Sequence, residues 1–221
     1  NKNIRPLGGW PLMSYTIKTA LLAKNIDRVI VSTDSEYYCD IAKKYGAEVP
    51  FLRPEELANS KIAKYPAIRH AITSCEKIFS KTYDFIIDLD PTSPLRDLDD
   101  ILECVNILKN KEVENVITAM PSRRSPYFNL IERDDEGFID LSKRISPLPS
   151  CRQDSPLCYD MNASIYGWKR SVLFENEIPI FLKNTHLHVM PEERSIDIDS
   201  DLDFEFVEYL LTKNNSKIRN D

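Results

Sequence analysis

The chain has 221 residues, a length that suits one large domain or a core with a small subdomain. Lys and Arg number 29 and Asp and Glu 35, which gives a net charge of −6. This balance argues against an extended nucleic-acid groove, and no apolar run is long enough to span a bilayer, so neither nucleic acid nor a membrane is expected as a partner. The five scattered cysteines form no CxxC pair and predict a reduced, cytoplasmic setting.

Helix-like and strand-like patterns alternate along most of the chain. Helices are expected at 11–24, 35–46, 66–79 and 97–109, and strands at 27–34, 47–52, 83–90, 114–120 and 161–168. This alternation predicts an α/β fold with an open, mostly parallel, doubly wound sheet. Ligands of such sheets bind at the carboxyl ends of the strands, where this chain carries the polar endings VSTD (31–34) and LDPTSP (89–94).

Residues 121–160 depart from the alternation. The region holds five prolines, and the short segments 127–132 and 137–142 flank the turn signal DDEG. This pattern predicts a β-hairpin that leaves the main sheet. We expect a β-rich arm inserted into a single domain that spans 1–221, with an oligomerisation arm, a lid and a subdomain as its possible roles.

The first residues, NKNIRPLGGWPL, form a pattern typical of a loop that enters a helix. A sheet built from alternating strands and helices normally opens with a strand. We therefore expect a first strand and its loop upstream of Asn1, and in folds of this type that loop often holds the nucleotide.

The stretch SIDIDSDLDF, residues 195–204, places a carboxylate at every second position. On a strand Asp197 and Asp199 project from the same face, and two such carboxylates can share a hard cation such as Mg²⁺. Asp203 instead follows Ser200 by three residues, the spacing of a helix start capped by a serine. The alternative for Asp197 and Asp199 is a solvated strand edge.

Six segments occur in an order that resembles the bacterial acylneuraminate cytidylyltransferases, the CMP-sialate synthetase family. They are NKNIRPLGGWPLMSYTI, VIVSTDSE, KKYGAEVPFLRPEELA, DLDPTSPLRDLDDI, RQDSPLCYDMNASIY and SIDIDSDLDF. The resemblance implies a fold of the nucleotide-diphospho-sugar transferase type, a need for Mg²⁺, and a homodimer joined by the arm at 121–160. It also implies the reaction of CTP with a nine-carbon 2-keto sugar acid to give the CMP-sugar and pyrophosphate, by attack of the anomeric hydroxyl on the α-phosphate.

The resemblance assigns roles to individual residues. Lys2 and Asn3 match the end of the family's phosphate-binding signature, whose glycine-rich part is absent before Lys2. Asp197 and Asp199 match the two aspartates of the family's metal-binding DID motif, so Lys2, Asp197 and Asp199 are the expected catalytic residues. Arg53 matches an arginine on the nucleotide side of the site.

Two further matches lie in and after the arm. Arg152 matches an arginine that reaches the sugar acid, often across a dimer interface, and Asn162 matches the asparagine of the strand after the arm. Each assignment has a structural alternative. Lys2 has the position of a frayed terminal residue, Arg53 that of a turn residue before a proline, and Arg152 that of a solvated charge in a mobile arm.

Three departures from the sialic acid pattern indicate the substrate. Asp90 stands where sialate enzymes usually have Gln, Asp160 stands where they commonly have Arg, and the segment around Lys64 replaces a Ser-rich stretch. Together with RRSPYFNLIE at 123–132, these positions resemble the subgroup that activates legionaminic acid. Exchanging neutral or cationic groups for carboxylates changes which hydroxyls and amides a pocket accepts, because unpaired buried polar groups discriminate steeply.

Two alternative functions remain open at this point. One is a CMP-N-acetylneuraminic acid synthetase, which shares the chemistry and differs in the sugar. The other is a non-catalytic relative that binds nucleotide or sugar. The absent glycine-rich signature favours this alternative, and the intact DID motif argues against it.

Overall fold

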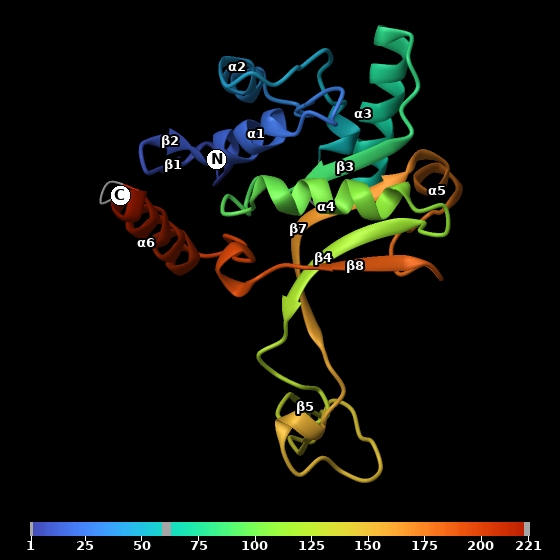
Figure 1. Cartoon of the computed structure of the whole chain (residues 1–221), viewed down its shortest axis with the longest axis vertical. Helices are drawn as coiled ribbons and strands as arrows, with labels where there is room; N and C mark the ends of the chain where they lie inside the picture. Colours follow the sequence, from blue (N-terminus) through green and yellow to red (C-terminus); the bar gives the residue numbers. More distant parts are fainter. Residues whose placement is uncertain (1, 59–62, 219–221) are drawn as a thin grey trace.

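The computed structural model describes residues 2–58 and 63–218, and a four-stranded sheet lies at its centre (Figure 1). The strand order is β3 (Phe85–Leu89), β7 (Tyr159–Lys169), β4 (Asn115–Pro121) and β8 (Thr185–Val189). β4 pairs in parallel with β8, whereas β7 is antiparallel to both β3 and β4. The sheet is therefore mixed. β3, β4 and β8 run in one direction, whereas the predicted strand at 161–168, part of β7, runs against them because it returns from the arm that β4 enters.

The helices expected from the sequence are all present, and local signals explain their ends. The α-helices are α1 (Leu12–Leu22), α2 (Glu36–Lys44), α3 (Lys64–Phe79), α4 (Leu98–Lys109), α5 (Arg170–Glu175) and α6 (Asp201–Ile218). Helix α1 begins directly after Pro11, and Ser35 caps α2 by accepting a hydrogen bond from the backbone N of Tyr38. The backbone of Gly46 has φ +98° just after α2, a conformation that glycine adopts freely.

Short elements connect these helices and strands. The 3₁₀ helices are η1 (Lys2–Ile4), η2 (Glu55–Leu57), η3 (Arg152–Asp154) and η4 (Glu192–Arg194). Two small antiparallel pairs complete the structure, β1 (Pro6–Leu7) with β2 (Trp10–Pro11) and β5 (Ile131–Arg133) with β6 (Ile139–Leu141).

Two predicted strands, 27–34 and 47–52, do not join the central sheet. They pair with each other through a parallel bridge between Ile30 and Glu48 and pack against α1 and α2. A groove of about 770 Å³ lies between the segment 27–34 and β3, lined on its two sides by residues such as Val31 and Ile87. The groove therefore separates the segment 27–34 from the sheet that the two predicted strands were expected to extend. The first strand expected upstream of Asn1 stays a prediction.

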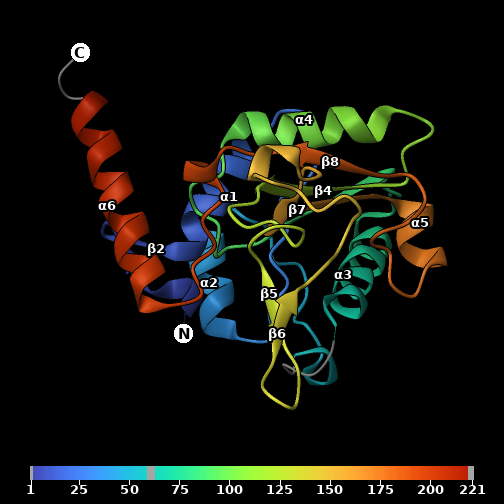
Figure 2. The ribbon, with the colours of Figure 1, turned by 90° about the horizontal axis from the view of Figure 1, so that it is seen from below.

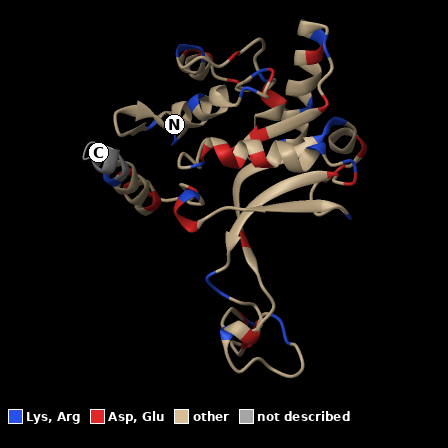
Figure 3. Cartoon of the chain, in the orientation of Figure 1, with Lys and Arg blue, Asp and Glu red and all other residues tan. Residues whose placement is uncertain are grey.

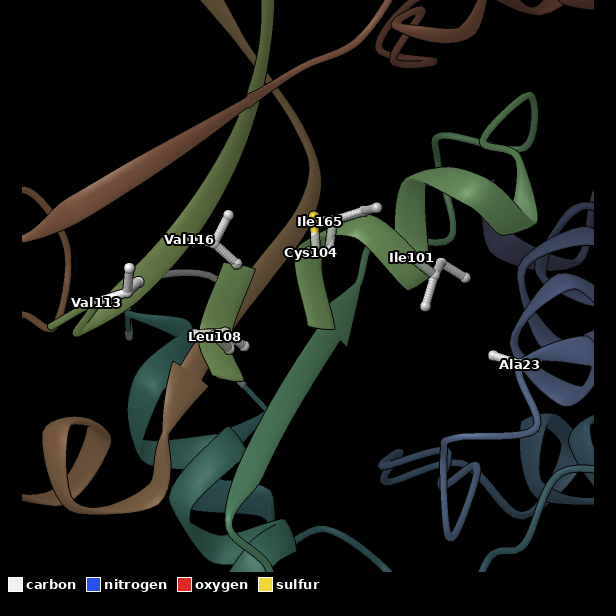
Figure 4. Packing of buried hydrophobic residues seen from close by; sticks show 7 residues of the cluster. All are labelled: Ala23, Ile101, Cys104, Leu108, Val113, Val116 and Ile165. Carbon is white, nitrogen blue, oxygen red and sulfur yellow. The ribbon is translucent and has the colours of Figure 1, made fainter. Parts of the chain in front are cut away.

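Apolar residues cover both faces of the sheet. Along β4 and β7, Val116 and Ile165 pack against α4 on one face, while Ile117 and Tyr166 pack against α3 and α5 on the other. Figure 2 shows α4 on one side of the strands and α3 and α5 on the opposite side, and Figure 4 shows the cluster beneath α4. Gly167 permits close packing, since a Cβ there would lie 2.7 Å from Val116 and 2.8 Å from Leu108.

The arm at 121–160 projects from the ends of β4 and β7, as the sequence predicts (Figure 1). Its hairpin consists of β5 and β6, which flank the predicted turn. Helix α6 leaves the body at the other side and packs through Phe204 and Val207 against Leu7 and Leu12. None of the helices in the described ranges is both long and apolar enough to cross a membrane.

Candidate active site

The acidic stretch follows η4, and its conformation differs from the prediction. Residues 196–199 form no strand, so the expected placement of Asp197 and Asp199 on one strand face does not apply. The segment is held by Ile198, which is 2% exposed and whose backbone N donates to the Thr92 carbonyl at 3.0 Å. Ile196 packs with the same apolar cluster as Ile198. The two isoleucines therefore bury one side of the segment, while Asp199 is exposed and Asp197 is partly buried.

The carboxyl group of Asp197 is partly buried and incompletely satisfied. Its Oδ1 atom is buried and has no hydrogen-bond partner among the described residues. Burial raises the pKa of Asp197, the charges of Asp199 and Asp90 raise it further, and the side chains of Thr92 and Lys2 oppose the shift. A buried carboxylate oxygen without a donor beside other carboxylates is an unfavourable arrangement unless a cation neutralises it.

Lys2 and Asp199 meet at this point although 197 positions separate them in the chain. Lys2 Nζ lies 3.2 Å from Asp199 Oδ1, and both side chains are exposed. The structure thus brings together the three residues expected to be catalytic. Within the described ranges, no group of three or more His, Cys, Asp or Glu residues has the geometry of a complete metal site. Asp197 and Asp199 supply two carboxylates, and Mg²⁺ is commonly held in proteins by one or two carboxylates, so these are the residues that would hold it.

Asp90 reaches this region through Thr92. Asp90 Oδ1 accepts hydrogen bonds from the backbone N of Thr92 at 3.1 Å and from its hydroxyl at 2.8 Å. The Thr92 carbonyl in turn accepts the hydrogen bond from Ile198. The turn after β3 and the acidic segment are therefore directly linked, and Asp90 lies close enough to raise the pKa of Asp197.

A buried arginine holds the turn after β3. Arg96 is 4% exposed and donates to the Asp90 carbonyl, to the carbonyl and hydroxyl of Ser164, and to the Thr16 hydroxyl, over 2.6 to 3.3 Å. Burial lowers the pKa of Arg96 to about 10, against the raising effect of Asp90, Asp88 and Asp100. One guanidinium thus ties the end of β3 to β7 and to α1.

Three further predicted residues line the groove beside β3, namely Asn3, Arg53 and Lys64. Lys64 Nζ donates to Asp88 Oδ2 at 2.7 Å and lies 3.4 Å from the centroid of the Tyr166 ring. Arg53 donates through Nη2 to the Ser32 carbonyl at 2.8 Å, while its buried Nε has no partner in the described part of the chain. Arg53 therefore holds a turn, as expected if its role is structural, and it also keeps one unpaired donor beside the groove.

Arg152 and Asp160 lie at the neck of the arm rather than beside the acid pair. Arg152 donates to the carbonyl of Ser122, and the Ser122 hydroxyl donates to Asp160 Oδ1 at 2.7 Å. The neck therefore joins Arg152 and Asp160 through one serine. Their roles toward a sugar acid stay predictions.

Asn162 is an interior residue, 5% exposed. Its Oδ1 accepts a hydrogen bond from the Thr118 hydroxyl at 2.7 Å, and its Nδ2 donates to Ser195 Oγ at 3.0 Å. The Asn162 amide thus supports the start of the acidic segment, and a direct substrate contact would require it to release these partners.

The four acids of the stretch divide as the sequence predicts. Asp203 Oδ2 accepts hydrogen bonds from the backbone N and the hydroxyl of Ser200, and Ser200 Oγ accepts one from the backbone N of Asp203 at 3.2 Å. This reciprocal pattern caps α6. Asp201 pairs with Arg5 at 2.5 Å on the surface. Figure 3 shows acidic residues at η4 and at the start of α6.

Sequence reasoning missed Thr92 and Asp88 as site residues. Thr92 stands inside the LDPTSP segment that was expected to bind ligand, so the sequence placed it near the site. The sequence did not predict that Thr92 would link Asp90 to Ile198. Asp88 lies on β3 two residues before Asp90, and alternation along a strand places both on one face. That spacing is the signal that could have identified Asp88.

A model of the family described as "Cytidylyltransferase" matches residues 1–204. The chain belongs to the cytidylyltransferase family. It is 44% identical over 215 residues to the post-translational flagellin modification protein B of Campylobacter coli and 42% identical over 215 residues to the CMP-N,N'-diacetyllegionaminic acid synthase of Campylobacter jejuni. Each match covers 97% of this chain and 90% of the relative. Family membership confirms that the chain is a nucleotidyltransferase.

The fold also has a solved counterpart. A structure of CMP:2-keto-3-deoxy-manno-octonic acid synthetase complexed with CTP superposes with a TM-score of 0.68 at 13% identity, over 96% of this chain and 92% of that one. This similarity confirms the α/β fold predicted from the sequence.

Proposed function

We propose that this cytidylyltransferase activates a nine-carbon 2-keto sugar acid of the legionaminic type with CTP, giving the CMP-sugar and pyrophosphate. The observation that carries the proposal is the unpartnered, buried Oδ1 of Asp197 beside Asp199 and Lys2. Two carboxylates and a lysine at the end of a sheet suit a triphosphate that arrives with a hard cation. The similarity to the C. jejuni CMP-N,N'-diacetyllegionaminic acid synthase supports the choice of sugar.

In this proposal Asp197 and Asp199 hold Mg²⁺, which when bound neutralises phosphate charge and polarises the α-phosphate. Lys2 exchanges its contact with Asp199 for the phosphates and offsets the charge of the departing pyrophosphate. The nucleotide occupies the polar side of the groove near Asn3 and Arg53, where the free Nε of Arg53 is a donor for it. Positioning and charge neutralisation, rather than covalent chemistry by the protein, carry such a transfer.

The sugar acid is assigned to the side of the site that holds Asp88, Asp90 and Lys64. Asp88 and Lys64 form an ion pair that leaves each side chain about one third exposed, so both present polar atoms to a ligand. These groups select hydroxyl and amide substituents, because a ligand that leaves them unpaired loses binding energy steeply. Asn162 supports this site from the interior and Asp160 from the neck of the arm.

The arm supports a homodimer as part of the proposal. Phe138, Ile139 and Leu157 are 70%, 65% and 86% exposed, more apolar surface than a projecting arm retains favourably in water. In a dimer this surface is covered, and Arg152 at the neck faces a sugar site that includes the second subunit. The enzyme is proposed to act in the cytoplasm.

The deciding experiment is a measurement of pyrophosphate release with CTP and Mg²⁺, with N,N'-diacetyllegionaminic acid and N-acetylneuraminic acid supplied in parallel. We expect faster turnover of the legionaminic acid. The variant Asp199→Ala is expected to lose activity by about 100-fold or more, because it removes a ligand that stabilises charge in the transition state. The variant Asp201→Ala is the matched control, since Asp201 lies two residues further on and pairs with Arg5.

Other outcomes distinguish the alternatives. A preference for N-acetylneuraminic acid would retain the chemistry and overturn the substrate roles of Asp90 and Lys64. No turnover of either sugar, with CTP still bound, would favour the non-catalytic relative. Equal loss of activity in the two aspartate variants would contradict the metal site.

A further inference from the structure

A buried carboxylate outside the proposed site connects three elements. Asp100 is 1% exposed and lies in the first turn of α4, where its Oδ2 accepts a hydrogen bond from the backbone N of Asp97 at 3.0 Å. Asp97 in turn caps the helix, so the two aspartates form a capping box. A cap of this kind needs only one oxygen of Asp100, and exposed capping residues serve as well as buried ones. The burial of Asp100 therefore indicates a second role.

That role concerns Arg194 and His188. Arg194 donates through Nε to Asp100 Oδ2 at 3.0 Å and through Nη2 to Oδ1 at 2.9 Å, and His188 Nε2 lies 3.0 Å from Oδ1. The paired geometry of the guanidinium fixes direction as well as distance. We refer to Asp100, His188 and Arg194 as the clamp. It joins the start of α4 to the end of β8 and to the last residue of η4.

The clamp acts directly on the chain that carries the acid pair. Arg194 precedes Asp197 by three residues, and Ser195 between them is buried and donates to the Pro191 carbonyl at 2.9 Å. Beyond Ser195, the backbone N of Ile198 bonds to Thr92. The segment is thus fixed on both sides of Asp197, by the clamp before it and by Thr92 after it.

Holding the segment on both sides of Asp197 counteracts the repulsion between its carboxylates. Asp90, Asp197 and Asp199 repel one another when ionised, and the buried Oδ1 of Asp197 has no hydrogen-bond donor among the described residues. Because residues 196–199 belong to no sheet, individual contacts oppose the repulsion among these acids, such as the Thr92 carbonyl with Ile198 and Lys2 with Asp199. A bidentate pair at the base of the segment resists displacement far better than a flexible loop does.

We propose that Asp100 is a positioning residue, which through Arg194 holds Asp197 and Asp199 at the spacing required to bind a divalent cation. This inference rests on the proposed function, since it concerns the same acid pair. Asp100 touches neither cation nor substrate, and its effect on the reaction passes entirely through the placement of the segment 195–199.

The test compares Asp100→Asn with the matched control Glu76→Gln. Glu76 also forms a bidentate pair with an arginine, Arg170, at 2.6 and 2.8 Å, but it joins the second half of α3 to the start of α5, away from Lys64 at the first residue of α3. Mn²⁺ binding to each folded protein is measured by electron paramagnetic resonance, alongside thermal unfolding and the Mg²⁺ dependence of pyrophosphate release. Arg194→Lys serves as a second variant, which keeps the charge but loses the paired geometry.

We expect Asp100→Asn to weaken Mn²⁺ binding and raise the Mg²⁺ requirement by roughly 10-fold or more, the usual range for residues that orient metal ligands. Arg194→Lys is expected to fall between this variant and the wild type, and Glu76→Gln to retain wild-type cation binding even where it lowers the melting temperature. If Asp100→Asn fails to fold, Arg194→Lys alone decides the comparison with Glu76→Gln.

Two results would overturn the inference. Unchanged cation binding in folded Asp100→Asn or Arg194→Lys would show that the clamp serves stability alone. Equal losses in those variants and in Glu76→Gln would show a general effect of destabilisation. The wild-type measurement separates this failure from that of the proposed function, because a wild type that neither binds Mn²⁺ nor releases pyrophosphate contradicts the proposed function itself.

Discussion

The region around the acid pair and the arm differ in how they use polar and apolar groups. In the elements that support the acid pair, two charged side chains, Arg96 and Asp100, are buried at 4% and 1% exposure and are hydrogen-bonded on several sides. Across 121–160, by contrast, Ser122 and Ser125 are the only buried residues, while several large apolar side chains are exposed. The first region is held in place by its own contacts. The arm is held by its hairpin and local hydrogen bonds, and its exposed apolar side chains are the basis of the proposed interface.

The largest effect is expected from breaking the buried network at Arg96. The variant Arg96→Met keeps much of the side-chain volume but leaves the Asp90 carbonyl and both Ser164 oxygens short of a donor. We expect the free energy of unfolding to fall by about 3 kcal/mol, since each buried polar group left unpaired costs roughly 1–3 kcal/mol. Urea unfolding measures the loss. An unchanged urea midpoint would show that water replaces the guanidinium without loss of stability. The buried polar network would then not distinguish this region from the arm.

The next effect concerns Asp100 and pH. Burial alone would raise its pKa, but the hydrogen bonds from His188 and Arg194 and from the backbone of Asp97 outweigh burial and lower the pKa to about 2 from 3.8. A carboxyl whose pKa is lower in the folded state stabilises the fold above its unfolded pKa and loses that contribution as pH falls. The contribution is therefore complete above about pH 4 and is lost toward pH 2.

The shift corresponds to a stabilisation on the order of 2 kcal/mol. The free energy of unfolding of the wild type and of Asp100→Asn is measured from pH 5 to pH 2. Taking the difference between the two proteins cancels the contributions of the other carboxylates. We expect the two stabilities to converge as the pH approaches 2. A constant difference across this range would contradict the lowered pKa.

A smaller effect tests the arm. We expect Phe138→Asp and Leu157→Asp to weaken self-association by about 10-fold or more, because each places a charge where an interface covers an apolar side chain. Analytical ultracentrifugation over a concentration series measures this, and thermal unfolding should show little loss within the subunit. The control is Ile178→Asp, which changes an apolar side chain of similar exposure, 63%, outside the arm. If the three variants self-associate with equal affinity, the arm does not form the interface.

The smallest effect is expected on the surface of the hairpin. Arg144 pairs with Asp140 at 2.6 and 2.9 Å, a bidentate geometry like that of Arg194 with Asp100. Both side chains are more than half exposed, so water and salt screen the pair. We expect Arg144→Ala to leave the melting temperature unchanged. A clear decrease would show that the hairpin relies on this pair and that burial is not what separates the two regions.

Local patterns in the sequence predicted the helices and the arm hairpin well. Pro11, Ser35 and Gly46 mark helix ends through backbone geometry and capping, which act within a few residues. The division of the acidic stretch at Ser200 was predictable for the same reason. The resemblance to cytidylyltransferases added the acid pair and Lys2, which the structure brings together.

Contacts between distant segments could not be predicted in this way. The sequence indicated an apolar strand at 27–34 but contained no information on its neighbour, and in the structure that segment pairs with Glu48 rather than with the sheet. The direction of β7 depends on the path of the arm. The interior position of Asn162 depends on Thr118 and Ser195, which meet it only after folding.

The sequence by itself therefore determined the helices with their caps, the hairpin and the family, because these depend on neighbouring residues or on short motifs. Only the tertiary structure decided which charges are buried and what satisfies them. Asp100 and Arg194 are 94 positions apart, and either alone has the pattern of an ordinary surface charge. Their pairing exists because packing of α4 against the sheet brings the end of β8 to the start of that helix, where burial makes the charge of Asp100 dependent on Arg194.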